Sequence, residues 1–452
     1  MAETRLERFA DFACHLQIDD LPSATRDKAA LHLIDTLAAG VAGSAASEAR
    51  RIRAALLTAT GPATVWGTST STAATTAALL NGIAAHAYEL DDSGGCDHSG
   101  AVVVPAVLAA AATAAAPVEH DRLILATVLG YDLGRRLQDA MGGYDAVNNA
   151  GWHSTAVCGP FAAAAAAAFT LRLDSEQTAN AIALASTAAA GTWAFVDRGA
   201  MSKRLHVGHA AQAGVEAALL AAAGYTGPVN LFEASWGGFL DLYADPSTAR
   251  PDQLTDRLGA SWRIDLASIK PHATCRSTHA AIDALLELKR RLPPTEKITH
   301  IEVATSQLIA DMCGGTQIDS LTTAQLSLAY SLALADCYER VELDDIIGGQ
   351  TDPVIAANMA SITIAVDPRQ SGGSALPYLT VTTSTGRVHH AQAARPLGGW
   401  DNPLSPDAVC AKARRLLTRV LPLPNVDALD AAVTGLSGNA AQISALLGTP
   451  AE

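Results

Sequence analysis

The chain has 452 residues and a formal net charge of −14, from 31 lysines and arginines against 45 aspartates and glutamates. This much negative charge repels nucleic acids and anionic membrane surfaces, and we expect the protein to bind neither. Apolar residues make up 49% of the chain and charged residues only 17%, which predicts a large folded core and argues against a disordered chain. The length alone suggests about two to three domains.

Helical periodicity runs through the first part of the sequence. Apolar residues recur at a spacing close to 3.6 in four long stretches, which Gly or Pro terminates. The stretches are residues 24–43, 76–90, 123–141 and 209–228. The same period returns near the carboxyl end, in SPDAVCAKARRLLTRVLPL. We therefore predict one large helical domain over residues 1–265, completed by residues 400–452.

Two alanine-rich stretches, AVVVPAVLAAAATAAAPV and GPFAAAAAAAFTL, are the most apolar parts of the chain. Alanine partitions poorly into lipid and Pro105, Pro117 and Pro160 interrupt the runs, so buried helices are favoured over membrane spans. We expect these helices to begin near Pro105 and near residue 160. Their alanines are typical of helices that pack closely against one another.

The sequence pattern changes after about residue 266. KITHIEVATS, MASITIAVDP and LPYLTVTTSTGRVHHAQA are short, rich in β-branched residues and partly alternating, as strands are. A smaller α/β domain, of the α+β kind, is predicted over residues 266–399. The fold class is therefore mostly α.

Neither a metal nor a cofactor is predicted. The seven cysteines are scattered and contain no C-x-x-C pair, which favours free thiols in a reducing cytoplasm over a zinc site. The amino terminus, MAETRLERFADFAC, lacks the pattern of a secretory signal. Asp91 and Asp92 are adjacent and would point about 100° apart on a helix, which suits chelation poorly. The glycines form no phosphate-binding fingerprint.

An acidic cluster lies in HAYELDDSGGCDHSGAVVVP. Asp91, Asp92 and Ser93 end one predicted helix, and Asp97 and His98 precede the next. The two intervening glycines allow a sharp turn. A capped interhelical loop with solvated acids is the plain alternative to a functional site.

Basic residues gather in later blocks of the sequence. The block RGAMSKRLHVGH places Lys203, Arg204, His206 and His209 at a predicted helix start, where the helix dipole disfavours cations unless an anion lies between them. An exposed basic turn is the alternative. The block SIKPHATCRSTH carries four further basic residues, which are Lys270, His272, Arg276 and His279. Two basic clusters on two domains of an acidic chain predict an interdomain cleft for a polycarboxylate.

Two more residues stand out in apolar surroundings. His153 lies in the small-residue block AGWHSTAVCGPF, and Tyr330 lies on the apolar stretch TAQLSLAYSLALADC. Taken singly, each is more typical of a satisfied core residue than of a functional one.

Taken in order, the blocks HAYELDDS…DHSGAVVVPAVLA, GWHSTAVCGPF, GAMSKRLHVGHAAQAG and KPHATCRSTHAAID closely resemble the signature blocks of the MmgE/PrpD family. That family includes 2-methylcitrate dehydratase, cis-aconitate decarboxylase and iminodisuccinate epimerase. The resemblance covers nearly the whole chain. It implies a large all-helical domain built from both chain ends, a smaller α/β lid, a homodimer, and cofactor-free chemistry on di- or tricarboxylates between the domains.

The resemblance also implies site residues. Its catalytic positions fall on His98, His153, Lys203 and Tyr330. Its substrate-binding positions fall on Glu89, Asp91, Asp92, Ser93, Arg276 and His279. We add Arg204, from the basic block beside Lys203, to the predicted substrate-binding residues. The chain departs from the family pattern at four places: Glu89 replaces an aspartate, Ser93 a threonine and Ser154 a proline, and Gly94-Gly95 stands where a further histidine is common.

We expect a lyase, either a dehydratase or a decarboxylase, that acts on a citrate- or aconitate-like acid. His98 and His153 would exchange protons, Lys203 would bind or protonate the substrate, and Tyr330 would donate a hydrogen bond to it. An epimerase of a dicarboxylate such as iminodisuccinate is the second hypothesis, which the glycines at 94 and 95 modestly favour because they remove a proton donor. A non-catalytic carboxylate-binding protein is the third.

Overall fold

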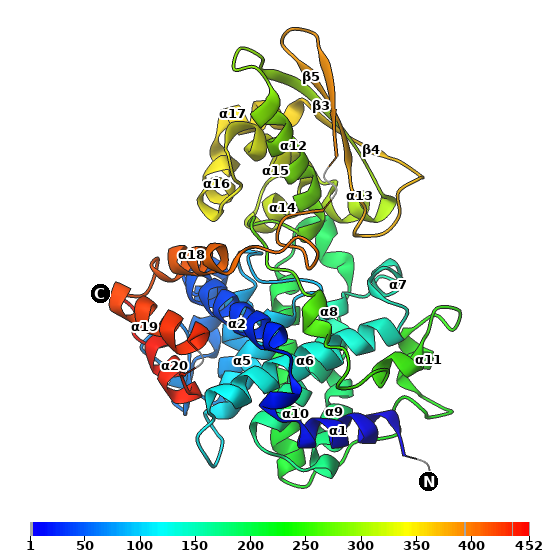
Figure 1. The fold of residues 1–452 in the computed structure, drawn as a ribbon, viewed down its shortest axis with the longest axis vertical. Helices are drawn as coiled ribbons and strands as arrows, with labels where there is room; N and C mark the ends of the chain where they lie inside the picture. Colours follow the sequence, from blue (N-terminus) through cyan, green and yellow to red (C-terminus); the bar gives the residue numbers. More distant parts are fainter. Residues whose placement is uncertain (1–2, 393–394, 436, 452) are drawn as a thin grey trace.

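The chain folds into a large helical body with a smaller lid standing on one end of it (Figure 1). The structure is a computed structural model that describes residues 3–392, 395–435 and 437–451. The mostly helical class predicted from the sequence is confirmed, as is a small sheet in the carboxyl-terminal half.

The body contains helices from both ends of the chain. Its amino-terminal helices are α1 (Arg5–His15), α2 (Ser23–Gly43), α3 (Ser47–Leu56), α4 (Ala74–Ala85), α5 (Ser99–Ala111), α6 (His120–Ala140), α7 (Tyr144–Asn149), α8 (Ser154–Thr170), α9 (Ser175–Ala185), α10 (Ser202–Ala222) and α11 (Phe239–Tyr243). Its carboxyl-terminal helices are α18 (Pro406–Leu417), α19 (Leu423–Thr434) and α20 (Ala440–Leu447). A short hairpin joins β1 (Ala63–Thr64) to β2 (Ser71–Thr72). Helix α18 packs on α2, so the two chain ends share one core (Figure 1).

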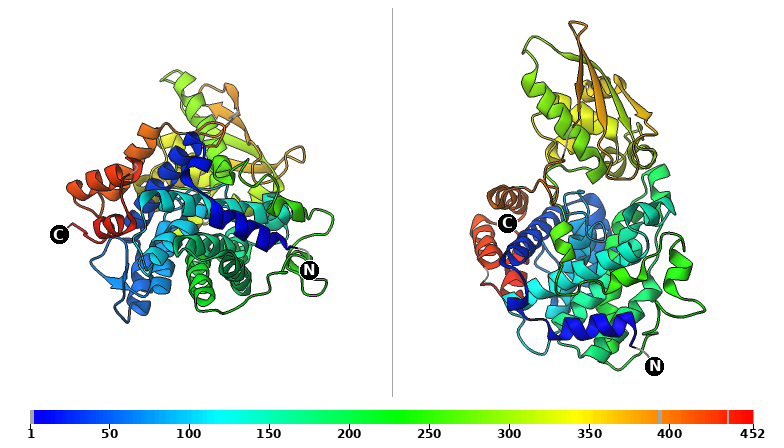
Figure 2. Two further views of the ribbon diagram at one scale, coloured as in Figure 1. Left: turned by 60° about the horizontal axis from the view of Figure 1, so that its bottom comes forward. Right: turned by 45° about the vertical axis from the view of Figure 1, so that its right-hand side comes forward.

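The lid pairs a mixed sheet with a layer of helices. The strands are β3 (Ile298–Thr305), β4 (Ile362–Val366), β5 (Tyr378–Thr383) and β6 (Val388–Ala391). Their order is β4-β3-β5-β6, with β3 and β4 parallel and the other pairs antiparallel. The helices are α12 (His279–Arg291), α13 (Gln307–Cys313), α14 (Leu321–Gln325), α15 (Leu328–Cys337), α16 (Leu343–Gly348) and α17 (Pro353–Ala360). Figure 2 shows that the chain crosses between lid and body before α12 and again before α18.

Small residues let the body helices approach closely. Helices α8 and α10 pack along their length. A Cβ added at Gly214 would lie 2.2 Å from the Cβ of Ala163, and one added at Gly208 would lie 2.4 Å from the carbonyl oxygen of Leu79. These contacts are below van der Waals distance, so only glycine fits. The alanine runs therefore serve helix packing, as the sequence predicted.

Two helix starts predicted from proline positions are wrong. Helix α5 begins at Ser99 and contains Pro105, and α8 begins at Ser154 and contains Pro160. A proline inside a helix removes one backbone hydrogen bond. Both helices are almost entirely buried, and burial along their whole length outweighs that loss.

The expected end of the preceding helix is wrong as well. Helix α4 ends at Ala85, so Asp91 and Asp92 lie in the connecting loop and not on a helix. We call residues 86–98 the acidic loop.

No single helix in the described parts of the chain is both long and apolar enough to cross a membrane. Helices α2 and α3 meet the length and composition test only as a pair, and that pair is bent by 81°.

Replacing Gly214 by valine tests the close contact of α8 with α10. Overpacking a core costs about 1–3 kcal/mol, and we expect the free energy of unfolding in urea to fall by that amount. Glu216→Val places the same side chain on the exposed face of α10, where a change within about 0.5 kcal/mol is expected. Equal losses in the two variants would contradict the contact.

Candidate active site

Glu89 joins two buried lysines from different parts of the chain. Its carboxylate forms an ion pair with Lys203 at the start of α10, and its other oxygen lies 2.9 Å from Nζ of Lys270. Lys270 also donates to the Glu89 carbonyl oxygen, at 3.1 Å. All three side chains are buried. The anion expected beside the cations at the start of α10 is therefore present, and it is the Glu89 carboxylate of the protein itself.

The ionisation of Glu89 follows from these partners. Burial alone would raise the pKa of Glu89, but the charges of Lys203 and Lys270 outweigh it and hold the pKa well below its usual value. The same pairing raises the pKa of Lys270 against the effect of burial. Both shifts favour the charged forms of Glu89 and Lys270 in the folded protein.

Asp91 holds two histidines of the acidic loop. It accepts hydrogen bonds from Nδ1 of His86 at 3.0 Å and from Nδ1 of His98 at 2.9 Å. The two imidazole rings lie 4.1 Å apart between centroids. Burial would raise the pKa of Asp91, but His86, His98 and Lys270 hold it well below its usual value. Because both Nδ1 atoms donate to Asp91, the Nε2 atom of each ring remains available for other partners.

Asp92 faces the core instead of the histidines of the acidic loop. It accepts hydrogen bonds from Nδ1 of His32 at 2.7 Å, from the Tyr131 hydroxyl, and from the backbone nitrogen of Gly100 at 2.8 Å. These partners lie on α2, α6 and α5. Asp92 thus anchors the acidic loop to three helices, while Asp91 orients the chemical groups.

Glycine is required where the acidic loop meets the segment that leads to the lid. Ser93 and Ser268 exchange backbone hydrogen bonds of 3.0 and 2.7 Å. Next to this bridge, Gly94 has a φ of +91°, and a Cβ there would lie 2.9 Å from the Leu266 carbonyl oxygen. A histidine does not fit at Gly94 in this backbone.

His98 and His153 are neighbours whose pKa values are shifted in opposite directions. Their ring centroids lie 6.1 Å apart, and both side chains are buried. Burial lowers the pKa of His98, but Asp97, with an oxygen 3.4 Å from Nε2, and Asp91 outweigh burial and raise it. Burial and the charge of Lys203 hold the pKa of His153 well below its usual value. His98 therefore holds a proton more readily than an ordinary histidine and His153 less readily, the arrangement of an acid beside a base.

Three predicted basic site residues have partners outside the cluster formed by Glu89, Asp91, His98, His153 and Lys203. Arg204, on α10 of the body, donates to the Ala87 carbonyl oxygen and, at 2.9 Å, to Oε1 of Gln325 in the lid. Arg276, in the crossover before α12, donates to the Leu397 carbonyl oxygen at 2.7 Å and lies 3.1 Å from Nδ1 of His279.

Tyr330 is placed inside the lid. Its hydroxyl donates to the Ile346 carbonyl oxygen at 2.9 Å, and its side chain is buried. In this conformation the hydroxyl does not donate the expected hydrogen bond to a substrate, because it already donates to a partner within the lid.

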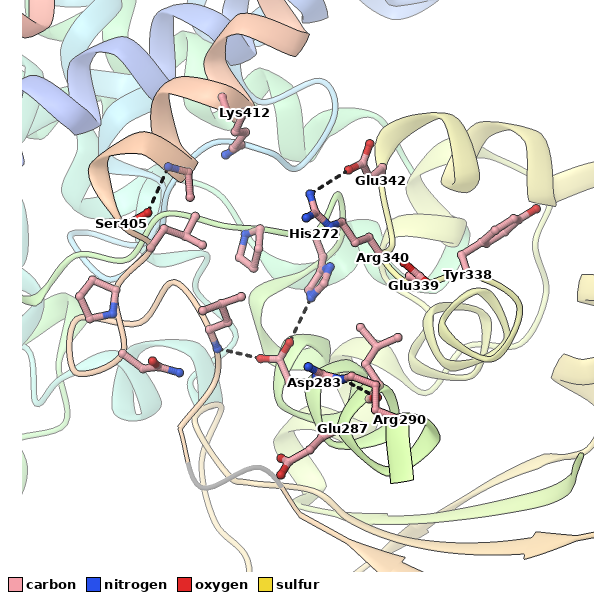
Figure 3. Close-up of a pocket in the computed structure, with 18 of the residues that line it drawn as sticks. His272, Asp283, Glu287, Arg290, Tyr338, Glu339, Arg340, Glu342, Ser405 and Lys412 are labelled. Atoms are coloured by element: carbon pink, nitrogen blue, oxygen red, sulfur yellow. Dashed lines mark hydrogen bonds and ion pairs between the residues drawn. The ribbon is translucent and has the colours of Figure 1, made fainter. Parts of the chain in front are cut away.

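A large cavity lies between lid and body, separate from the buried cluster. It encloses about 1450 Å³ and is bordered by α12, by the loop after α15 and by α18 (Figure 3). His272 lies 3.2 Å from Asp283 on its wall. Lys412, which also borders it, donates to the Leu90 carbonyl oxygen at 2.7 Å. The cavity therefore reaches the back of the acidic loop, but its lining includes neither His98 nor His153.

The buried cluster is closed in this conformation. Glu89, His98 and Lys203 are each 3% exposed, and Asp91 and His153 are not exposed. A second cavity, of about 620 Å³, is bordered by Tyr88 and Met201, which are close in sequence to Glu89 and Lys203. A ligand can reach the cluster only if the lid or the acidic loop moves.

Sequence reasoning missed several side chains of the cluster. His86 went unnoticed, although it lies three residues before Glu89. Lys270 was noted in a basic block but was not assigned to the site. Cys275 belongs to the same block, and the neighbouring Cys313 thiol lowers the pKa of Cys275 against the effect of burial. Pairing the acidic residues of one predicted domain with the basic residues of the other would have pointed to Lys270.

Two groups of side chains have the donor types of a metal site. Ligand-type atoms of His86, Asp91 and His98 lie within 4.8 Å of one another, and so do those of Asp97, His98 and His153. The hydrogen bonds of Asp91 to both rings account for the first convergence without an ion. In the second group, an oxygen of Asp97 lies 3.4 Å from Nε2 of His98.

Comparison with known proteins identifies the family. The MmgE/PrpD N-terminal domain matches residues 7–252, and the MmgE/PrpD C-terminal domain matches residues 272–435. The chain belongs to the MmgE/PrpD family. The second match runs through α18 and α19, so it includes part of the helical body.

Three relatives in this family illustrate the similarity. The chain is 29% identical to the cis-aconitate decarboxylase-like protein oryM of Aspergillus oryzae, over 97% of this chain and 95% of the relative. It is 31% identical to a cis-aconitate decarboxylase of Aspergillus terreus, over 72% of this chain and 70% of the relative. It is 30% identical to human cis-aconitate decarboxylase, over 67% of this chain and 64% of the relative.

Glu89→Gln tests the charge balance of the cluster. Neutralising one partner of a buried ion pair costs about 3–5 kcal/mol, so we expect a lower free energy of unfolding at neutral pH. The pKa of Glu89 is lowered from 4.5 in the folded state. The stability it contributes is therefore present above pH 4.5 and is lost as the pH falls toward the folded pKa.

The measurement is urea unfolding of wild type and Glu89→Gln across this pH window. The variant should lose less stability on acidification than the wild type, because one titrating carboxylate is gone. Glu216→Gln, on the exposed face of α10, is the matched control and should follow the wild-type pH dependence. Identical slopes for Glu89→Gln and wild type would refute the pairing.

Proposed function

We propose that the protein is a cofactor-independent lyase that decarboxylates a tricarboxylic acid of the cis-aconitate class. The observation that carries the proposal is the contact of His98, whose pKa is raised, with His153, whose pKa is lowered, next to two lysines that share one carboxylate. The relatives named cis-aconitate decarboxylase support the choice of reaction.

The lysines supply the charge that a carboxylate substrate needs. Lys203 and Lys270 carry two positive charges and Glu89 carries one negative charge, so these three groups have a net charge of +1. A substrate carboxylate next to Lys203 would take up this excess charge. In a closed site, such cations also stabilise the negative charge that develops on the substrate during reaction.

The two histidines supply the proton steps. His153 takes the proton of the carboxyl group that leaves, and the C–C bond breaks to release CO₂. The electron pair of that bond stays on the carbon skeleton, where a remaining carboxylate delocalises it. His98 then gives its proton to carbon. Transfer of a proton from His153 to His98 restores the starting state, so that atoms and charges balance over the cycle.

Removal of an α-proton is the second candidate chemistry, and it would make the protein a dehydratase or an epimerase. The Nε2 atom of His153 is buried and has no hydrogen-bond partner among the described residues. A neutral imidazole with a free nitrogen is suited to take a proton from carbon. The same two histidines would then act as base and acid on one stereocentre.

A panel of carboxylic acids in D₂O, followed by NMR, separates these reactions. Decarboxylation gives CO₂ and a deuterated alkene diacid from cis-aconitate, which is the result we expect. Dehydration of 2-methylcitrate gives an alkene without CO₂, and epimerisation gives deuterium at the α-carbon. Activity should survive treatment with a chelator. No turnover of any acid would contradict the proposed function, and loss of activity with the chelator would contradict its metal-free form.

Replacing either histidine tests the acid–base pair. His98→Gln and His153→Gln should each lower kcat by about 10²- to 10⁴-fold, whereas His15→Gln, at an exposed position on α1, should leave it unchanged. Because only protonated His98 donates, kcat should fall as the pH rises through a value above 6.5, the usual pKa of histidine. Full activity of His98→Gln would exclude His98 as the acid.

The homodimer implied by the family resemblance also stays a proposal. Light scattering on the purified protein measures it directly.

A further inference from the structure

His206 makes an unusual contact with the candidate base His153. The Nδ1 atoms of the two rings lie 3.2 Å apart. His206 is on α10, and His153 precedes the first residue of α8. His153 is fully buried, whereas His206 is partly exposed. The sequence places His206 in the basic block with Lys203, but no proposed step uses its side chain.

Two facing ring nitrogens need one proton between them. Burial and the charge of Lys203 lower the pKa of His206 to about 4, and the pKa of His153 is also well below its usual value. Both rings are therefore neutral near pH 7, and each carries one N–H. If His153 donates from Nδ1, its Nε2 is a free acceptor. If His206 donates, Nε2 of His153 carries the hydrogen.

The unpartnered side of the His153 ring favours the first arrangement. The Nε2 atom of His153 is buried without a hydrogen-bond partner among the described residues. A hydrogen on Nε2 would leave a buried N–H donor without an acceptor, which is rarer in folded proteins than an acceptor without a donor.

The ring pair is held in place by the segment around residue 191. The Gly191 carbonyl oxygen accepts a hydrogen bond from the backbone nitrogen of His153 at 3.0 Å. A Cβ at Gly191 would lie 3.2 Å from two carbons of the His206 ring. Phe195 meets both rings edge-on, with centroid distances of 5.7 Å to His153 and 5.9 Å to His206. The rings therefore cannot turn freely, and the contact between them is fixed.

We propose that His206 is a positioning residue that accepts a hydrogen bond from Nδ1 of His153 and thereby keeps Nε2 of His153 free to take a proton. The importance of His206 for activity rests on the proposed function. Its effect on the tautomer of His153 does not depend on that function. In the tautomer with Nε2–H, His153 is a donor, and it cannot act as the base until it changes tautomer.

Two measurements test the role of His206. Nitrogen-15 NMR of the imidazoles, assigned with His153→Gln, reports which nitrogen of His153 carries the hydrogen and needs no substrate. Steady-state kinetics on the acid identified by the panel reports the effect on the reaction. The variants are His206→Leu, which removes the acceptor, and His206→Asn, which keeps a polar group near the position of Nδ1. His209→Asn, at an exposed position on the same helix, is the control.

We expect Nδ1–H on His153 in the wild type and a shift toward Nε2–H in His206→Leu. Loss of such a supporting partner costs about 10- to 100-fold elsewhere, and a fall of this size is expected in kcat with KM little changed. His206→Asn should recover most of the loss, and His209→Asn should match the wild type.

Wild-type His153 with its hydrogen on Nε2 would overturn the proposal, and so would an unchanged tautomer and kcat in His206→Leu. If His206→Leu fails to fold, the wild-type spectrum still decides between the two tautomers. If no acid is turned over, the proposed function fails, but the NMR spectra still test the hydrogen bond between His153 and His206.

Discussion

The carboxylate of Glu89, held between two buried lysines, is the interaction on which the rest of the site depends. Lys203 belongs to the body and Lys270 to the segment that leads into the lid. Neither lysine can stay charged in the core without this carboxylate, since an unpaired buried charge is costly. Glu89 therefore fixes the acidic loop, the start of α10 and the base of the lid in one place.

The same loop explains how a closed, mostly apolar body can hold reactive groups. Asp92 anchors the loop to α2, α5 and α6, whereas Asp91 accepts hydrogen bonds from Nδ1 of two histidines and so orients both rings. The difference between His98 and His153 then follows from their surroundings, because His98 faces carboxylates and His153 faces cations and aromatic rings. Gly94 is required by its close approach to the segment at Leu266.

Helical periodicity, alanine runs and β-branched segments predicted the fold well, because local pattern decides which face of an element is buried. Proline positions misled at Pro105 and Pro160, since burial of a whole helix outweighs one missing hydrogen bond. For the site, the order of motifs pointed to His98, His153 and Lys203. It did not reveal Lys270 as a partner of Glu89, or His206 as a partner of His153, because these contacts join residues far apart in the chain. Nor did it show that the hydroxyl of Tyr330 points to Ile346 inside the lid.

We propose that the buried cluster around Glu89 and His98, and not the large cavity beside α12 and α18, binds the substrate. A crystal structure with propane-1,2,3-tricarboxylate, which has three carboxylates but lacks the double bond of cis-aconitate, would distinguish the two places. We expect a carboxylate of this ligand within hydrogen-bond distance of Lys203, next to His98 and His153, with the lid or the acidic loop displaced. A ligand seated only in the cavity lined by His272 and Arg340, over an unchanged and closed cluster, would contradict it.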